Sequence, residues 1–249
     1  MNQTYKTQGI ILKRWDYKER DKMVRILTND FGKITTRAIS ARKITSKLAG
    51  HLEPFIHSDL FIAHSKTIDI VAGSNTIESH ALLRQSLPHN AIANYFAEII
   101  DRFTEERHTD KELFMHVLHF YNWLNVHGAN TLVLYAAIIQ LFQILGFHVE
   151  LYRCHSCKQL IGQEGNKFYY ALWNVECMNC SSHEETTPLS ANVIKILRFL
   201  SKQPFDAVAQ LRVYDAEWKE CDTLIRSILH YHLDKDLRSE PIFLSFLQA

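Results

Sequence analysis

Two C-x-x-C pairs stand close together in the second half of the chain: Cys154 with Cys157, and Cys177 with Cys180, with nineteen residues between the pairs. Each pair can present two thiolates from one tight turn, and two such turns can close a tetrahedron around one metal ion. We therefore predict one structural Zn²⁺ ion held by these four residues. Four protein ligands leave no open position for water or substrate, so we expect this site to hold structure and not to catalyse hydrolysis.

Two other arrangements of these cysteines stay open: disulfides, or a histidine in place of one thiolate. Disulfides are favoured in secreted proteins, whereas residues 1–8 are polar and lack the apolar core of a secretory signal. His155 and His183 lie near enough in sequence to compete as ligands. The fifth cysteine, Cys221, lies among apolar residues at helical spacing, so we predict a place for it in a hydrophobic core.

Basic residues are concentrated near the N-terminus. The 249-residue chain has a net charge of +1, yet residues 13–47 carry 11 Lys or Arg against 4 Asp or Glu, whereas residues 81–249 carry 15 against 19. A local excess of this size on a nearly neutral protein favours a polyanionic partner. An ordinary solvated surface is the alternative interpretation.

Short runs in the first 75 residues alternate between apolar and polar residues, as half-buried strands do. Gly32 supplies a turn between two of these runs. Five short strands in so short a segment favour a small closed barrel, and the OB-fold is the natural candidate. We predict strands at 9–15, 22–28, 33–39, 55–63 and 68–73.

After residue 75 the apolar residues recur at helical spacing. Thr109 is predicted to cap one helix, with Glu112 at the third helical position. The nearly all-apolar helix at 131–145 is predicted to lie at the centre of a bundle. Helices are expected at 86–103, from 109 to 127, and at 131–145, 190–200 and 217–233.

The predicted fold class is therefore α+β. We expect an N-terminal OB-fold, nucleic-acid-binding domain at residues 1–78. A helical domain at 79–249 follows and contains the zinc module at about 150–185. The apolar tail at 241–247 is expected to dock back on the body.

Contact with nucleic acid would use the cations and aromatic residues of the basic segment. Lys and Arg neutralise phosphates, and an exposed aromatic ring can stack on an unpaired base. The alternative for each aromatic is a place in the barrel core. The predicted nucleic-acid-binding residues are Lys13, Arg14, Trp15, Arg20, Lys33, Arg37, Arg42, Lys43 and Lys47.

Signals for catalysis are weak. The chain contains no phosphate-binding G-x-x-x-x-G-K-[ST] loop, no G-x-G-x-x-G and no H-E-x-x-H or G-x-S-x-G motif. His116 and His119 share a predicted helix face, and a structural role is the simpler interpretation for them. We expect no enzymatic activity. A zinc-dependent enzyme, which would need an open coordination position, is the alternative.

Several short segments form an ordered set along nearly the whole chain. They are Gly-Ile-Ile-Leu-Lys-Arg at 9–14, Tyr-Lys-Glu-Arg-Asp at 17–21, Leu-Thr-Asn-Asp-Phe-Gly-Lys at 27–33, Ala-Ile-Ser-Ala-Arg-Lys at 38–43, Leu-Glu-Pro-Phe at 52–55, Tyr-His-Leu at 231–233 and Leu-Arg-Ser at 237–239. This set resembles the RecO recombination and repair proteins of bacteria. The chain departs from that family at Ser40, where Gly is usual, so the backbone geometry of this turn is the point in question.

The resemblance implies a DNA-binding mediator of recombinational repair. Such proteins bind single- and double-stranded DNA and anneal complementary strands, including strands coated with the single-strand-binding protein SSB. The implied partners are RecR and the acidic C-terminal tail of SSB, with functional links to RecA and RecF. We expect a cytoplasmic, nucleoid-associated protein with no membrane partner. A protein-binding adaptor with a structural zinc site and no direct DNA role is the alternative.

Overall fold

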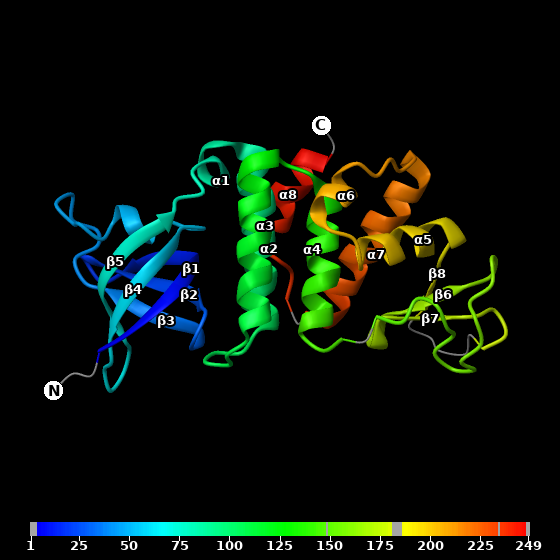
Figure 1. The fold of residues 1–249 in the computed structure, drawn as a ribbon, viewed down its shortest axis with the longest axis horizontal. Coiled ribbons are helices and arrows are strands. Elements are labelled where there is room, and N and C mark those ends of the chain that lie inside the picture. The colour runs from blue at the N-terminus through cyan, green and yellow to red at the C-terminus, as the bar shows by residue number, and fades with distance from the viewer. Residues whose placement is uncertain (1–3, 148, 181–185, 234, 248–249) are drawn as a thin grey trace. The chain divides into compact units, whose positions relative to one another are not determined.

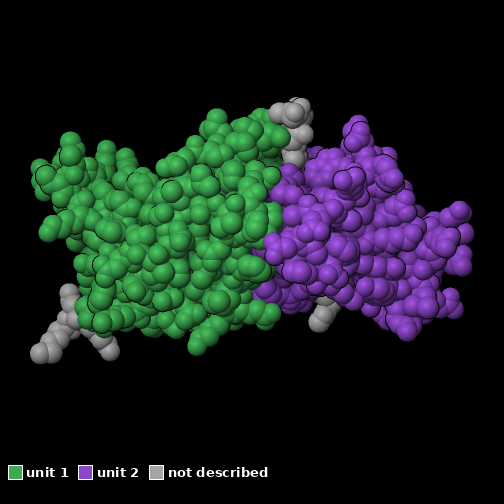
Figure 2. All heavy atoms as spheres, turned by 45° about the horizontal axis from the view of Figure 1, so that its top comes forward, with its two compact units in different colours: residues 1–129, 237–249 green, residues 130–236 purple. Residues whose placement is uncertain are grey.

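A computed structural model describes residues 4–147, 149–180, 186–233 and 235–247 (Figure 1). The chain forms two compact units, which are coloured separately in Figure 2. Unit 1 comprises residues 1–129 and 237–249, and unit 2 comprises residues 130–236. The division into functional domains at residue 78 stays a prediction. Each unit is described below by itself.

Unit 1 begins with five strands that close into a barrel in the order β1-β2-β3-β5-β4. Residue Arg37 pairs in parallel with Ile70 and closes the ring between β3 and β5. The predicted barrel is thereby confirmed, with the strand number of an OB-fold. The strands are β1 (Thr4–Tyr17), β2 (Asp21–Thr28), β3 (Gly32–Ala38), β4 (His57–Ala63) and β5 (Ile70–Glu78), and a 3₁₀ turn, η1 (Gly50–Leu52), lies between β3 and β4.

Alternation along these strands fills the barrel with aliphatic side chains. Strand β1 pairs with both β2 and β4, and its register with β2 shifts between Ile11 and Lys13. Gly9 lies at a close approach, because a Cβ there would stand 2.6 Å from the side chains of Ile26 and Leu60. The core residues are Ile11, Val24, Ile26, Ile34, Ala38, Ala41, Leu52, Ile56, Leu60, Ile62 and Val71.

Helices complete unit 1: α1 (Leu82–Gln85), α2 (Leu87–Phe103), α3 (Lys111–His127) and α8 (Glu240–Leu247). The predicted docking of the C-terminal tail is confirmed, because the buried ring of Phe243 stacks on Tyr95 of α2 at 4.4 Å between centroids. Glu98 of α2 accepts hydrogen bonds from the backbone N–H groups of Arg238 and Ser239, at 3.1 and 2.9 Å. These bonds fix the entry of α8 against α2.

The predicted cap of α3 is wrong by one residue. Asp110, not Thr109, is the N-cap, and its carboxylate accepts a hydrogen bond from the backbone N–H of Leu113 at 3.0 Å. The Thr109 hydroxyl instead donates to the carbonyl of Asp30 in the β2–β3 turn at 3.2 Å. Thr and Asp both cap helices well, so their intrinsic preferences do not separate them. The contact of Thr109 with Asp30, which is distant in sequence, leaves the N-cap position to Asp110.

Unit 2 contains the remaining helices and a small sheet with strand order β7-β6-β8. Helix α4 is buried along nine of its residues, as predicted for a helix that is apolar on all sides. Cys221 of α7 is fully buried, which confirms its predicted place in the core. The elements are α4 (Thr131–Ile144), β6 (Lys167–Tyr169), η2 (Tyr170–Leu172), β7 (Asn174–Glu176), β8 (Thr186–Pro188), α5 (Ala191–Leu200), α6 (Phe205–Ala209) and α7 (Asp215–His232).

Candidate metal centre and nucleic-acid interface

The four cysteines of the two C-x-x-C pairs come together in unit 2. The Sγ atoms of Cys154, Cys157, Cys177 and Cys180 all lie within 4.8 Å of one another, and the Cys157 and Cys177 sulfurs are 3.8 Å apart. Four sulfurs at the usual Zn–S bond length of about 2.3 Å have tetrahedral edges of about 3.8 Å. The cluster therefore has the size of a metal site. It is also the one such group of metal-ligating side chains found among the described residues.

Each pair sits on a tight turn closed by a backbone hydrogen bond. The N–H of Lys158 donates to the carbonyl of Cys154 at 2.9 Å, and the N–H of Cys180 donates to that of Cys177 at 3.1 Å. Strands β6 and β7 form an antiparallel pair between the two turns. The hairpin therefore brings together cysteines that are about twenty residues apart in sequence.

Hydrogen bonding divides the four thiols into unlike environments. Burial opposes ionisation of Cys154, but the backbone N–H groups of Cys157, Cys177 and Ser156 outweigh burial and lower the pKa of this thiol to about 6. Hydrogen bonds with Cys157 and Cys177 raise the pKa of Cys180 to about 12. Such unequal pKa values are expected where several thiols crowd one site, because only a cation lets all four ionise together.

His155, one of the two competing histidine ligands, is not part of the sulfur cluster. His155 places its Nδ1 atom 3.1 Å from the side-chain nitrogen of Asn174. His183 lies outside the described residues. The sulfur cluster alone therefore supplies a complete tetrahedral ligand set.

Most of the basic segment at 13–47 is neutralised by carboxylates. Seven of its cations form ion pairs, several with acidic residues that lie far away in sequence. The sequence could not show this neutralisation, because it depends on the fold. The paired residues are Lys13 with Asp101, Arg14 with Glu53, Lys22 with Asp16, Arg25 with Asp101 and Glu106, Lys33 with Asp101, Arg37 with Asp21, and Arg42 with Asp16.

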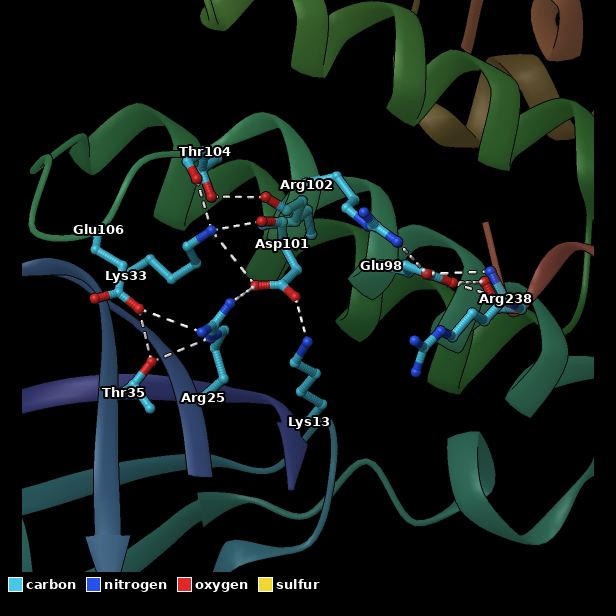
Figure 3. Close-up of polar contacts among 12 residues, drawn as sticks. Lys13, Arg25, Lys33, Thr35, Glu98, Asp101, Arg102, Thr104, Glu106 and Arg238 are labelled. Atoms are coloured by element: carbon cyan, nitrogen blue, oxygen red, sulfur yellow. Dashed lines mark hydrogen bonds and ion pairs between the residues drawn. The ribbon is translucent and has the colours of Figure 1, made fainter. Parts of the chain in front are cut away.

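Asp101 of α2 is the centre of the densest group of ion pairs (Figure 3). Its carboxylate lies 2.5 Å from Lys13 Nζ, 2.6 Å from Arg25 Nη1 and 3.4 Å from Lys33 Nζ. Burial pushes the pKa of Asp101 upward, but the hydrogen bonds from Arg25 and Lys13 outweigh burial and hold it below the ordinary value. The group is therefore a structural connection between the barrel and α2.

Lys33, one of the predicted nucleic-acid-binding residues, does not lie on the surface. The side chain is buried, and its ammonium donates to the backbone carbonyls of Asp101 and Thr104 at 2.5 and 2.6 Å. Burial also lowers the pKa of this ammonium group. We therefore leave Lys33 out of the interface proposed below.

Four cations of the segment are exposed and have no carboxylate partner among the described residues: Lys18, Arg20, Lys43 and Lys47. Arg42 links the two stretches that carry them. Its N–H donates to the carbonyl of Arg20 at 3.0 Å, and its Nη1 donates to that of Lys18 at 3.1 Å. We call Lys18, Arg20, Lys43 and Lys47 the basic rim. Lys18 was not among the predicted site residues, although its position in the polar β1–β2 connection could have indicated it.

A hydrogen bond between Asp21 and Ser40 joins the two backbone segments that carry the basic rim. The Asp21 carboxylate accepts a hydrogen bond from the N–H of Ser40 at 2.8 Å and one from Arg37 Nε at 2.7 Å, and both lower the pKa of Asp21. Ser40 has φ of +55°, a left-handed conformation that favours glycine. The conformation therefore agrees with the preference for Gly at this turn that the family resemblance implies.

Trp15 is the aromatic side chain best placed for stacking on a base. It is 38 % exposed, and the Lys13 ammonium and the Arg25 guanidinium lie 5.7 and 6.0 Å from its ring centroid. Phe31, by contrast, packs on Tyr5 at 4.4 Å between centroids and against the barrel core. The barrel therefore presents an exposed ring bordered by cations.

Comparison with known proteins matches nearly the whole chain to one family. The model of the recombination protein O N-terminal region matches residues 1–80, and that of its C-terminal region matches residues 84–241. The chain is 34 % identical to the DNA repair protein RecO of Roseiflexus sp. (strain RS-1) over 239 residues, which cover 96 % of the chain and 84 % of that protein. It is 32 % identical to the protein of that name from Dehalococcoides mccartyi (strain BAV1) over 232 residues, covering 93 % and 92 %. Among the described residues, no helix is long and apolar enough to cross a membrane.

Proposed function

This chain belongs to the RecO family of DNA repair proteins, and on that premise we propose that it is a DNA-binding mediator of recombinational repair. In this role it binds single- and double-stranded DNA and anneals complementary strands, including strands coated with SSB. With RecR it assists the loading of RecA, and RecF acts in the same process. No catalytic step is part of the proposal, and the protein would act in the cytoplasm at the nucleoid.

The observation that carries this proposal is the unneutralised charge of the basic rim. Elsewhere in residues 13–47, carboxylates occupy the cations, and displacing them would cost ion pairs. The ammonium and guanidinium groups of Lys18, Arg20, Lys43 and Lys47 face solvent without such competition. Phosphates that bind there need not displace a carboxylate. Their binding releases counterions, and that release favours binding.

We assign the remaining predicted residues to the flanks of the rim. Arg42 is 39 % exposed and pairs with Asp16 at 3.4 Å, so it can share its charge with a phosphate. Lys13, Arg14 and Arg37 are held more closely by carboxylates and would contribute less. Trp15 would supply stacking to an unpaired base.

For the metal centre we propose one structural Zn²⁺ held by Cys154, Cys157, Cys177 and Cys180. The support is the size of the sulfur cluster and its all-thiolate chemistry. When bound, the ion would cross-link the two turns. The chain's own contribution is to present four sulfurs from one hairpin and to direct N–H groups at Cys154.

A salt titration of single-strand binding tests the DNA assignment. For single strands, the slope of log affinity against log salt is about −0.7 for each phosphate contacted. Replacing Arg20, Lys43 and Lys47 with Ala should flatten the slope by about 2. The matched control replaces Lys6, Lys66 and Lys111, which are three exposed cations of the same unit, and should leave the slope unchanged. Equal slopes in the two triple variants would contradict the proposed interface.

The acidic tail of SSB is a proposed second ligand, and it distinguishes the mediator from an adaptor that binds protein alone. An adaptor would bind an acidic peptide through its cations but would not bind oligonucleotides. Full-chain protein that binds the SSB tail and shows no salt-dependent DNA binding would favour the adaptor.

A further inference from the structure

Helix α5 in unit 2 carries a line of cations on one side. Lys195, Arg198 and Lys202 are spaced by three and four residues, so their side chains lie along the same side of the helix and the turn that follows it. The apolar residues Val193, Ile194, Leu197 and Leu200 face the core. Lys195 and Lys202 are exposed, and among the described residues no carboxylate pairs with any of the three cations.

Tyr152 holds two of these cations in place. The Arg198 guanidinium carbon and the Lys202 Nζ each lie 4.4 Å from the centroid of its ring. The two charges are therefore at most about 8.8 Å apart, which is close to one Debye length at physiological salt. An anion placed near the ring would feel both.

The guanidinium is further fixed by the backbone. Arg198 Nε and Nη2 both donate to the carbonyl of Leu151, at 3.0 and 2.6 Å. The cation is thereby ordered before any ligand arrives, which lowers the entropy cost of binding. A planar guanidinium beside a lysine ammonium suits a phosphate group, because both donate charge-assisted hydrogen bonds to its oxygens.

The charge of this face differs from that of its unit. Residues 130–236 contain 10 Lys or Arg and 12 Asp or Glu. Arg153 and Lys158 are further exposed cations of this unit, and Arg153 Nη1 donates to the carbonyl of Lys158 at 3.1 Å. The carboxylate of Glu150 also lies here, and it accepts the backbone N–H groups of Tyr152 and Arg153. Exposed cations without a carboxylate partner therefore lie along α5 on a unit whose net charge is negative.

We propose that Lys195, Arg198 and Lys202 form a second phosphate-binding face for single-stranded nucleic acid, on a different unit from the basic rim. This inference rests on the proposed function. Two cations lie 4.4 Å from the centroid of the Tyr152 ring, closer than the 5.7 and 6.0 Å of the cations beside Trp15, so the Tyr152 ring serves to order charge and not to stack bases. Binding at this face is therefore independent of sequence. A protein that anneals strands gains from two such surfaces, since each can hold one strand.

The test uses the full chain and a fluorescently labelled oligothymidylate. The variant K195A/K202A removes two exposed charges and keeps Arg198, whose loss would release the Leu151 carbonyl. The salt slope should flatten by about 1.4, which corresponds to two single-strand phosphate contacts. The matched control R212A/K219A removes two exposed cations of the same unit and should bind like the unchanged protein.

Other outcomes separate this inference from the function on which it rests. If the unchanged protein does not bind the oligonucleotide, the proposed function itself fails. If the R20A/K43A/K47A variant binds weakly while K195A/K202A behaves like R212A/K219A, the α5 face is overturned and the proposed function stands. If K195A/K202A loses binding only to a polyglutamate peptide, the face binds acidic protein and the nucleic-acid assignment is wrong.

Discussion

The carboxylate of Asp101 in α2 accepts a hydrogen bond from the guanidinium of Arg25 in β2 at 2.6 Å, and this contact joins the barrel to the first long helix. Lys13 and Lys33 converge on the same carboxylate (Figure 3). Three cations of the basic segment are thus paired with a carboxylate inside unit 1, which leaves them less available to a polyanion.

Replacing Asp101 with Asn should destabilise the protein. The change removes the negative charge that faces the buried Lys33 and the half-buried Arg25, and breaking a buried ion pair typically costs about 3–5 kcal/mol. Urea unfolding of D101N against the unchanged protein measures it. Asp59→Asn, an exposed β4 carboxylate, is the control and should change stability by less than about 0.5 kcal/mol. Equal stability of D101N and the unchanged protein would contradict the structural role.

The same carboxylate should contribute to acid sensitivity. Its folded-state pKa lies below its ordinary value of 3.8, so its stabilising contribution is present above that pH and is lost as the pH falls through the folded-state pKa. The difference in unfolding free energy between the unchanged protein and D101N should therefore be constant near neutral pH. It should shrink below about pH 4. A difference that grows with acid would reverse the assigned sign.

Gly32 should not tolerate a side chain. It has φ of +64°, and a Cβ there would lie 2.1 Å from the carbonyl oxygen of His108. Gly32→Ala therefore combines left-handed strain with a backbone clash, and we expect a loss of about 2–4 kcal/mol. Gly50→Ala is the control, because nothing lies within 4 Å of a Cβ at that position. Thermal unfolding of both variants gives the comparison.

Much of the barrel follows from the sequence, because alternation predicts which face of each strand is buried. The strand ends were less predictable. Strand β1 begins at Thr4, five residues before the predicted start at Gly9, since pairing with β4 supports the polar residues at its beginning. Likewise, the short strand β8 and helix α6 lack a strong period and were not predicted.

The cysteine cluster was predictable and the unpaired cations were less so, for one physical reason. Two C-x-x-C turns carry their geometry locally, and only the hairpin between them had to form. The availability of a cation depends instead on distant carboxylates such as Asp101, Glu53 and Glu106, none of which belongs to the basic segment. Charge counts predict that a polyanion binds, but the fold decides which cations remain free.

Removing the metal should unfold the cysteine module first. Without a cation the four thiols cannot all ionise, so the two turns lose their cross-link. A chelator or Cys177→Ser should lower bound zinc to well under one ion per chain and speed proteolysis within residues 150–185. Cys221 is buried and lies outside the cluster, so the control variant Cys221→Ser should bind as much zinc as the unchanged protein. If zinc is lost and neither proteolysis nor stability changes, the proposed structural role fails.

The most direct test of the proposed mediator role is the annealing of complementary oligonucleotides coated with SSB. The unchanged protein should accelerate annealing well above the spontaneous rate. The basic-rim variant R20A/K43A/K47A should lose most of that acceleration, and the control K6A/K66A/K111A should keep it. Failure of the unchanged protein to accelerate annealing, or equal acceleration by the two variants, would contradict the proposal that free cations of the rim hold the DNA.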